Sequence, residues 1–298
     1  MYNGPRESGR TEPGTVSGRS LLDTLGQVYL EMGERSRAEE IWAEMRGRAA
    51  RANDPNLIVS SLRTEVTIAT LDGHLEEAFV VGEQVKIRGE ELGIPSTANA
   101  LEILSTSYAR LHLGRLEESV DGARSLLQRS PTKSASRLQT WLEGVSLAIA
   151  GRTAEAFKIS REFSAKGNHG DPEDETGLAA LEFMLDLAVL VDDRQTVEVL
   201  YPRLAVLDNV TWVGLFGQPV HRILGDAAAL LGDHGAARAH YLKSLELTGK
   251  MRFRPEIALT RLQVAELLLE HYPDERPEAL EHMDFAIGEL RDMKMSPP

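Results

Sequence analysis

The chain contains no cysteine and few aromatic residues, and each shortage excludes a class of protein. Without cysteine, its 298 residues cannot form disulfides, thiolate metal sites or a cysteine nucleophile. Aromatic residues make up 5% of the sequence, and no stretch shows the bounded alternation of β-branched and polar residues that marks a strand. No run of eighteen apolar residues occurs, so we expect no transmembrane helix. These absences favour an all-α protein of a reducing compartment, the cytoplasm.

The beginning of the chain also lacks features. Residues 1–19 read MYNGPRESGRTEPGTVSGR, with several glycines and prolines and no apolar segment like that of a signal peptide. We expect a disordered leader over 1–19 and a single folded domain over 20–295. The leader would equally suit the edge of a larger protein.

Basic residues are outnumbered. The 33 Lys and Arg face 46 Asp and Glu, which gives a net charge of −13. Proteins that bind duplex DNA usually neutralise phosphates with a basic face. We therefore expect no direct nucleic-acid binding, and we interpret the charge as an aid to solubility. The lack of a long apolar run leads us to expect no membrane partner either.

What the chain does have is an internal period. The segment EMGERSRAEEIW at 31–42 is repeated in outline as LLGDHGAARAHY at 230–241. A turn residue recurs every 37 to 42 positions, at Gly33, Gly73, Gly114, Gly151, Asp192, Gly232 and Asp274. Five places later stands a small or β-branched residue, at Ala38, Ala78, Ser119, Ala156, Val197, Ala237 and Ala279. Self-similarity at this period predicts an array of repeats.

Physical chemistry explains each element of the period. A glycine just past a helix end adopts the left-handed conformation that terminates the helix. The small residue lets two antiparallel helices approach closely, and a large residue four places later, such as Trp42 or Tyr241, fills the adjacent space. Prolines such as Pro55 and Pro95 separate one hairpin from the next.

The pattern predicts about seven helical hairpins stacked as a right-handed α-solenoid. We expect first helices over 20–32, 56–71, 97–113, 134–150, 175–191, 215–231 and 256–272. We expect second helices over 35–51, 75–92, 116–129, 153–166, 194–207, 234–249 and 276–293.

These positions resemble the tetratricopeptide repeat (TPR) family. Repeat one carries Gly26, Tyr29, Ala38 and Trp42, and repeat six carries Gly225, Ala228, Ala237 and Tyr241. The usual repeat has 34 residues, whereas the period here is nearer 40. Residues 219–293 further resemble the C-terminal helical arrays of bacterial signal-transduction ATPases, adenylate and guanylate cyclases and LuxR-type regulators.

The resemblance implies a binding surface on the first helices, which line the concave face of such arrays. By the repeat numbering, the inner exposed positions are Asp23, Gln27, Arg63, Thr67, Tyr108, Trp141, Glu182, Asp186, Arg222, Asp226 and Arg261. Charges of both signs with two aromatic residues suit a groove for a protein or peptide.

We therefore expect a non-enzymatic interaction module without cofactor or metal, acting as a scaffold or sensor in a bacterial signalling or transcription-regulatory system. The alternative is a sensor domain that binds a small effector molecule. An enzyme is disfavoured, because no Walker A, GxGxxG, HExxH or GxSxG motif occurs.

Several local features allow a second interpretation. Glu182 and Asp186, four residues apart on a helix, suit an acid–base pair or ordinary polar positions. The acidic residues within 171–175 suit calcium or the start of a helix. His234 and His240 are six apart and do not share a helical face, so they make a poor metal site.

Two tryptophans and two apolar segments can each be interpreted in more than one way. Trp141 and Trp212 suit either core packing or a ligand platform. The stretch TWVGLFGQPVHR at 211–222 suits a lengthened, kinked helix or a bend that contacts a ligand. Near Phe285 the last helix carries apolar residues off its main stripe, which predicts an apolar patch covered by the leader, by a segment outside this sequence, or by another copy of the chain through self-association of the C-terminal hairpin.

Overall fold

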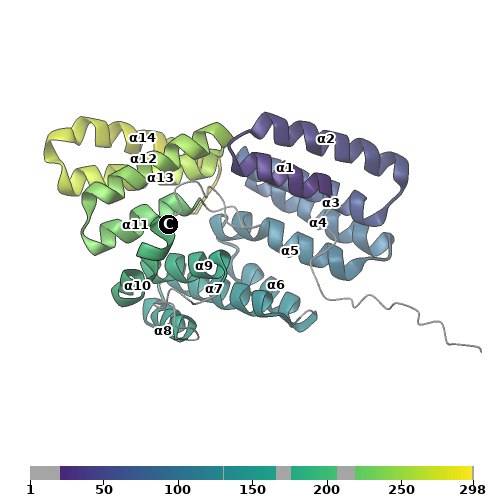
Figure 1. Cartoon of the computed structure of the whole chain (residues 1–298), viewed down its shortest axis with the longest axis horizontal. Coiled ribbons are helices and arrows are strands. Elements are labelled where there is room, and N and C mark those ends of the chain that lie inside the picture. The colour runs from purple at the N-terminus through teal and green to yellow at the C-terminus, as the bar shows by residue number, and fades with distance from the viewer. Residues whose placement is uncertain (1–20, 130, 166–175, 207–218, 297–298) are drawn as a thin grey trace, which may run out of the picture.

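The computed structural model describes residues 21–129, 131–165, 176–206 and 219–296. Within these residues the chain forms fourteen α-helices and one short 3₁₀ helix, with no strand (Figure 1). Consecutive helices pack against one another. The all-α class and the packing of consecutive helices are thus confirmed, while the solenoid and its right hand stay predictions. No helix in these ranges is long and apolar enough to cross a membrane.

The helices pair into the seven expected hairpins. The first helices are α1 (Leu21–Glu31), α3 (Pro55–Leu71), α5 (Pro95–His112), α7 (Lys133–Ile149), α9 (Leu178–Leu190), α11 (Val220–Leu231) and α13 (Arg254–His271). The second helices are α2 (Arg35–Ala52), α4 (Leu75–Glu91), α6 (Leu116–Arg129), α8 (Thr153–Ser164), α10 (Arg194–Ala205), α12 (His234–Met251) and α14 (Arg276–Asp292). The described part of α11 begins at Val220, because Pro219 before it has an extended backbone (φ −73°, ψ 121°), and the predicted start at 215 lies outside the described ranges.

The turns inside the hairpins follow the predicted chemistry. Each of the five turn glycines has a positive φ, between 72° at Gly114 and 87° at Gly232. Asp192 takes the same left-handed conformation, with φ of 56°, which aspartate tolerates better than most residues. The seventh turn differs: Asp274 lies in the 3₁₀ helix Pro273–Glu275 and has no positive φ.

Close packing inside each hairpin rests on the small residues of the period. All seven residues five places beyond the turn are buried. Across from them, the Trp42 ring lies so close to Gly26 that a Cβ there would come within 2.2 Å of it. Tyr241 and Gly225 repeat this arrangement in the sixth hairpin, where the approach would be 2.3 Å.

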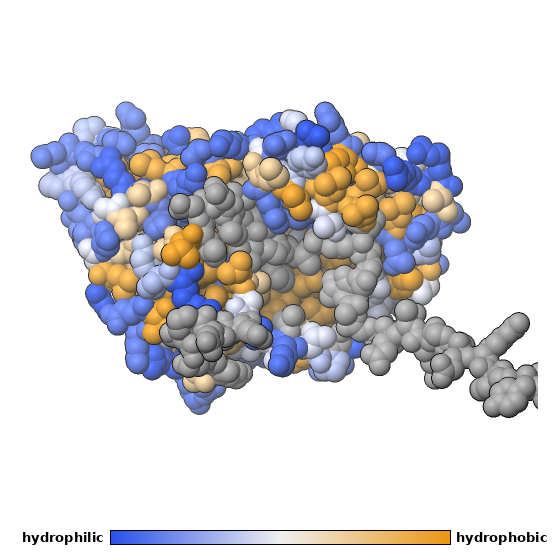
Figure 2. Space-filling view, viewed as in Figure 1, coloured by the Kyte–Doolittle hydropathy of each residue, from blue (hydrophilic) through white to orange (hydrophobic). Residues whose placement is uncertain are grey.

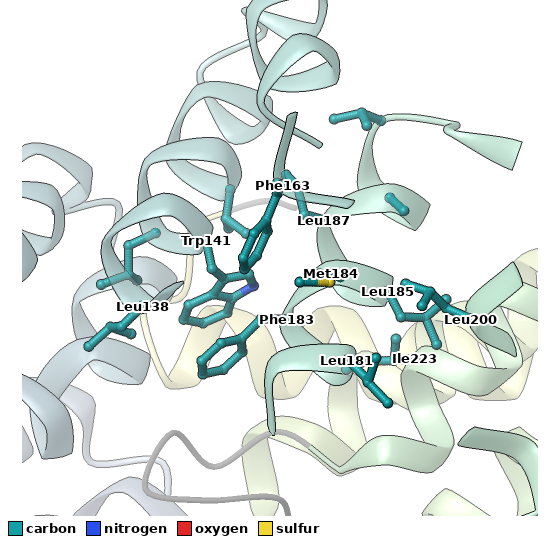
Figure 3. Close-up of a cluster of buried hydrophobic side chains, with 14 of the residues drawn as sticks. Leu138, Trp141, Phe163, Leu181, Phe183, Met184, Leu185, Leu187, Leu200 and Ile223 are labelled. Atoms are coloured by element: carbon teal, nitrogen blue, oxygen red, sulfur yellow. The ribbon is translucent and has the colours of Figure 1, made fainter. Parts of the chain in front are cut away.

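An apolar cluster centred on Trp141 fills the middle hairpins (Figure 3). The Trp141 ring stacks on Phe183, with ring centroids 4.7 Å apart and planes 15° from parallel. Phe163 and Met184 lie in the same cluster. This cluster extends from α5 to α11, so consecutive helices of the middle hairpins share one core.

The two ends of the array meet, which the repeat pattern did not predict. Arg35, at the start of α2, donates to the main-chain carbonyls of Met251 and Arg252. The Ser296 amide donates to the His112 carbonyl at 2.7 Å, beyond the end of α14. Residues of α1 to α5 and of α12 to α14 share one apolar cluster, and Figure 1 shows these two groups side by side.

Candidate functional site

Six of the eleven predicted groove residues lie in one polar cluster between five first helices. Glu256 of α13, which the sequence did not single out, joins them. We call this group the central cluster, and its members are Tyr108, Trp141, Glu182, Asp186, Arg222, Asp226 and Glu256. The repeat register therefore brings side chains from α5, α7, α9, α11 and α13 to one place.

Glu256 is the hub of the cluster and is fully buried. Tyr108 donates its hydroxyl proton to Oε1 of Glu256 at 2.8 Å. Arg222 donates from Nε to Oε2 at 2.7 Å, a charge-assisted bond. The same guanidinium lies 3.5 Å from Asp226. Arg222 thus connects α11 to α13 through the carboxylate of Glu256. It also pairs with Asp226, which lies one turn later on α11.

Asp226 accepts two further hydrogen bonds. Its donors are the hydroxyl of Tyr241 at 2.7 Å and the side-chain amide of Gln263 at 2.8 Å. Burial raises the pKa of Asp226 to about 7, even though Arg222 and both hydrogen bonds act to lower it. Near neutral pH this carboxyl group therefore changes its charge readily.

Trp141 and Asp186 join α7 to α9. The indole Nε1 of Trp141 donates to Oδ2 of Asp186 at 2.8 Å, and both side chains are buried. Trp141 therefore belongs both to the apolar core and to the central cluster. Burial raises the pKa of Asp186, opposed by Arg222 and by the bond from Trp141.

Glu182 lies one turn before Asp186 on α9, with 2% of its surface exposed. Its Oε2 atom is buried and has no hydrogen-bond partner. Burial, then repulsion from Asp186, holds its pKa well above the usual range. The two residues do lie close together, but in a buried setting rather than at ordinary polar positions of a solvated helix.

Carboxyl groups outnumber cations in the central cluster by four to one. The cation is Arg222, and the carboxyl groups belong to Glu182, Asp186, Asp226 and Glu256. His112, which lies near Arg222, adds no compensating charge, because burial and that guanidinium lower its pKa to about 3. The raised pKa values of Glu182, Asp186 and Asp226 mean that these carboxyl groups retain protons at higher pH than usual, which reduces the negative charge of the cluster.

The other predicted groove residues lie elsewhere. Arg63 makes two hydrogen bonds to Asp23, one of them 3.3 Å from Nε to Oδ2, and donates to Thr67 at 3.2 Å. Gln27 donates to Glu31 on its own helix. The Arg261 guanidinium lies 4.1 Å from the ring centre of Phe285. These residues belong to the first two and the last hairpins and do not reach the central cluster.

The expectation that the groove positions are exposed was wrong. Nine of the eleven are buried, and Asp226 and Arg261 are partly buried. The physical reason is that polar side chains of neighbouring first helices pair with one another, as Arg63 does with Asp23. The surface of the first helices is covered further where the two ends of the array meet. There Tyr108 of α5 donates a hydrogen bond to Glu256 of α13.

The sequence pattern did not indicate Glu256, Gln263 or His112. Glu256 follows Pro255 in the first turn of α13, where a carboxylate is expected merely to favour the helix dipole. No local signal distinguishes it. Its role follows from the approach of α13 to α5 and α11, which is a contact between distant repeats.

The remaining local features give no metal centre. His234 stacks on His271 with centroids 3.5 Å apart, and His240 lies beside His221 and Tyr201. Over the described ranges no group of three or more His, Asp or Glu side chains is arranged to hold a metal ion. The acidic segment 171–175, for which calcium binding was one of two interpretations, falls outside those ranges, as do Trp212 and most of the stretch 211–222.

Comparison with known proteins adds no relative. No protein-family model matches the chain, and no curated protein shows significant sequence similarity to it.

Proposed function

We propose that this chain is a non-enzymatic recognition module of the tetratricopeptide type, which binds a basic group of a protein or peptide partner at the central cluster. The observation that supports this most directly is the Oε2 atom of Glu182, buried without a hydrogen-bond partner among an excess of carboxyl groups. The proposal extends to a scaffold or sensor role in a bacterial signalling or transcription-regulatory system, as the sequence resemblance implies.

The energetics favour a cationic guest. A buried polar atom without a partner costs roughly 1–3 kcal/mol, and a buried carboxylate without a counter-charge costs more. A proton relieves this cost at Glu182 only in part, because Oε2 remains unbonded. A lysine ammonium or an arginine guanidinium would supply both charge and hydrogen-bond donors.

A second candidate is a small effector molecule that carries an amine or guanidinium. The specific observation in its favour is the contact between the two ends of the array, through Arg35 and through the Tyr108–Glu256 bond. Such a contact restricts the size of a guest near the central cluster. The chemistry of recognition is the same in both cases, so one experiment can distinguish the two.

The test uses isothermal titration calorimetry with two kinds of probe. One is a set of Arg- and Lys-containing peptides with acidic peptides of equal length as controls, and the other is free arginine and lysine. Binding of basic peptides alone supports the partner function, and binding of the free amino acids supports the effector function. Binding of the acidic set only, or of neither set, would reject both.

A variant pair ties the signal to the site. Glu182→Gln removes the charge while keeping the shape, and should weaken binding of a basic probe by about tenfold or more. Glu198→Gln on α10 removes an exposed carboxylate that pairs with Arg194, and should leave binding unchanged. Because the guest displaces a proton from the cluster, the observed heat should also depend on the ionisation heat of the buffer.

A further inference from the structure

Helix α1 carries an apolar stripe that faces away from its own hairpin. The stripe consists of Leu21, Leu25 and Val28 of α1, which are 83%, 40% and 44% exposed, and of Met32 in the turn directly after α1, which is 62% exposed. On the face drawn in Figure 2, apolar surface gathers where Figure 1 places α1. A contiguous stripe of this kind on an otherwise polar chain marks an interaction surface.

The stripe is also free of charge. Every exposed residue within α1 is uncharged, namely Leu21, Thr24, Leu25 and Val28, although 27% of the chain is charged. The charged residues of this helix are Asp23, which is buried against Arg63, and the half-buried Glu31. Depletion of charge is the compositional mark of an interface core.

The repeat itself shows what these positions do when they are covered. In the sixth hairpin, the residues 199 places later than Leu21, Leu25 and Val28 are Val220, Leu224 and Ala227. All three are buried against α9 and α10 of the preceding hairpin. The same register on α1 is therefore shaped to pack against a helix.

The spacing of the residues in the stripe indicates which helix packs against it. Its members follow one another at intervals of four, three and four residues, the spacing of a helix–helix seam. This order reads the same in both directions. Two antiparallel copies of α1 would place Leu25 opposite Val28, and Leu21 opposite Met32, on both sides of a twofold axis. We propose that α1 packs against α1 of a second copy of this chain in this antiparallel register.

Two further observations favour a second copy over other occupants. Residues 1–20 contain only Met1, Tyr2 and Val16 as large apolar residues, too few to match the stripe. The chain carries a net charge of −13, so two copies repel each other unless they meet on a neutral face. The exposed face of α1 is such a face. This inference is independent of the proposed function.

The test measures the mass of the full chain by sedimentation velocity over a dilution series. Because the stripe offers only four apolar residues per copy, we expect a weak dimer that dissociates on dilution. Leu25→Lys and Val28→Glu should each abolish the dimer, because each places a charge in the seam. Mixing the two variants should restore it, since the ammonium introduced in one copy would then face the carboxylate introduced in the other.

Two control variants distinguish this seam from others. Val80→Glu changes an exposed apolar residue of α4 and should leave dimerisation unchanged. Phe285→Glu tests the C-terminal self-association that the sequence predicts. A circular-dichroism melt of each variant verifies folding. Any of three results would overturn the proposal. The chain could be monomeric at all concentrations, the dimer could be lost with Phe285→Glu alone, or the mixed variants could fail to pair.

Discussion

The guanidinium of Arg35 lies against the main chain of Met251, 216 residues further along the sequence. It donates to the carbonyl oxygens of Met251 and Arg252 at 3.3 and 3.1 Å, and to Asp72 at 2.7 Å. Arg35 thereby fastens the start of α2 both to the next hairpin and to the end of α12. One buried side chain joins the two ends of the array.

We expect Arg35→Met to loosen this junction. The change leaves two carbonyl oxygens without their donor, which costs about 1–3 kcal/mol. Hydrogen exchange of the amides in 251–254 should speed up, and the melting temperature should fall. Arg48→Met serves as the control, because Arg48 makes an exposed ion pair with Glu44 on the same helix and such pairs contribute little. Equal melting temperatures for both variants would contradict the junction.

The small residues of the period should resist enlargement. Ala237→Leu forces a larger side chain into a fully buried contact between α11 and α12, and should cost about 1–3 kcal/mol. Ala43→Leu adds the same atoms at an exposed position of α2 and should stay within about 0.5 kcal/mol of the parent. Urea unfolding of both variants measures the difference, and equal midpoints would argue against the hairpin packing described above.

Two glycines should respond to alanine with opposite signs. Alanine favours helix over glycine by about 1 kcal/mol, so Gly47→Ala in α2 should stabilise, since its Cβ meets nothing closer than 3.6 Å. Gly225→Ala places a Cβ within 2.3 Å of the Tyr241 ring and should destabilise despite the same helical gain. Thermal melts of the two variants check the signs. Stabilisation by Gly225→Ala would show that Tyr241 moves freely.

The contribution of Asp226 to stability should fall as pH rises from about 4 to 7. In this window the folded chain retains a proton on Asp226, whose pKa is raised to about 7, while the unfolded chain has lost it. The folded state then binds more protons, so the free energy of unfolding decreases with pH, by up to about 4 kcal/mol for one such group. Glu182 and Asp186, whose pKa values are also raised, act in the same direction.

Asp226→Asn isolates this contribution. The amide keeps an acceptor for Tyr241 or Gln263 and does not ionise, so the slope of stability against pH between 4 and 7 should become flatter. The measurement is urea unfolding at intervals of pH in buffers of constant ionic strength. An unchanged slope would show that Asp226 does not hold the extra proton.

Local features of the sequence were enough to predict the helices and their pairing. Each of these features determines structure within one repeat of about 40 residues, so its effect can be predicted without tertiary information. The features are the turn residues, the small residues such as Ala38 and Ala237, and the prolines between hairpins. The register also predicted six members of the central cluster. Their burial was not predicted, because it depends on pairing between neighbouring first helices, as for Trp141 with Asp186, and on contacts between distant repeats, as for Tyr108 with Glu256.

Glu256 illustrates that limit. Its partners Tyr108 and Arg222 lie 148 and 34 residues away, and only the approach of α13 to both α5 and α11 brings them together. The contact of Arg35 with the end of α12 depends on the same long-range geometry. A repeat pattern specifies how each hairpin meets its neighbour, and small changes in that step, summed over seven hairpins, decide whether the ends meet.

Contact between the ends also changes how the chain is expected to unfold. A linear repeat array is stabilised by nearest-neighbour interfaces, and its terminal units fray first. Here the first hairpins are bonded to the last through Arg35, through Lys294 with Glu76, and through the Ser296 amide. Loss of the last hairpin would then weaken the first, so damage at one terminus would propagate to the other, and the unfolding transition would become more cooperative than that of an open array of equal length.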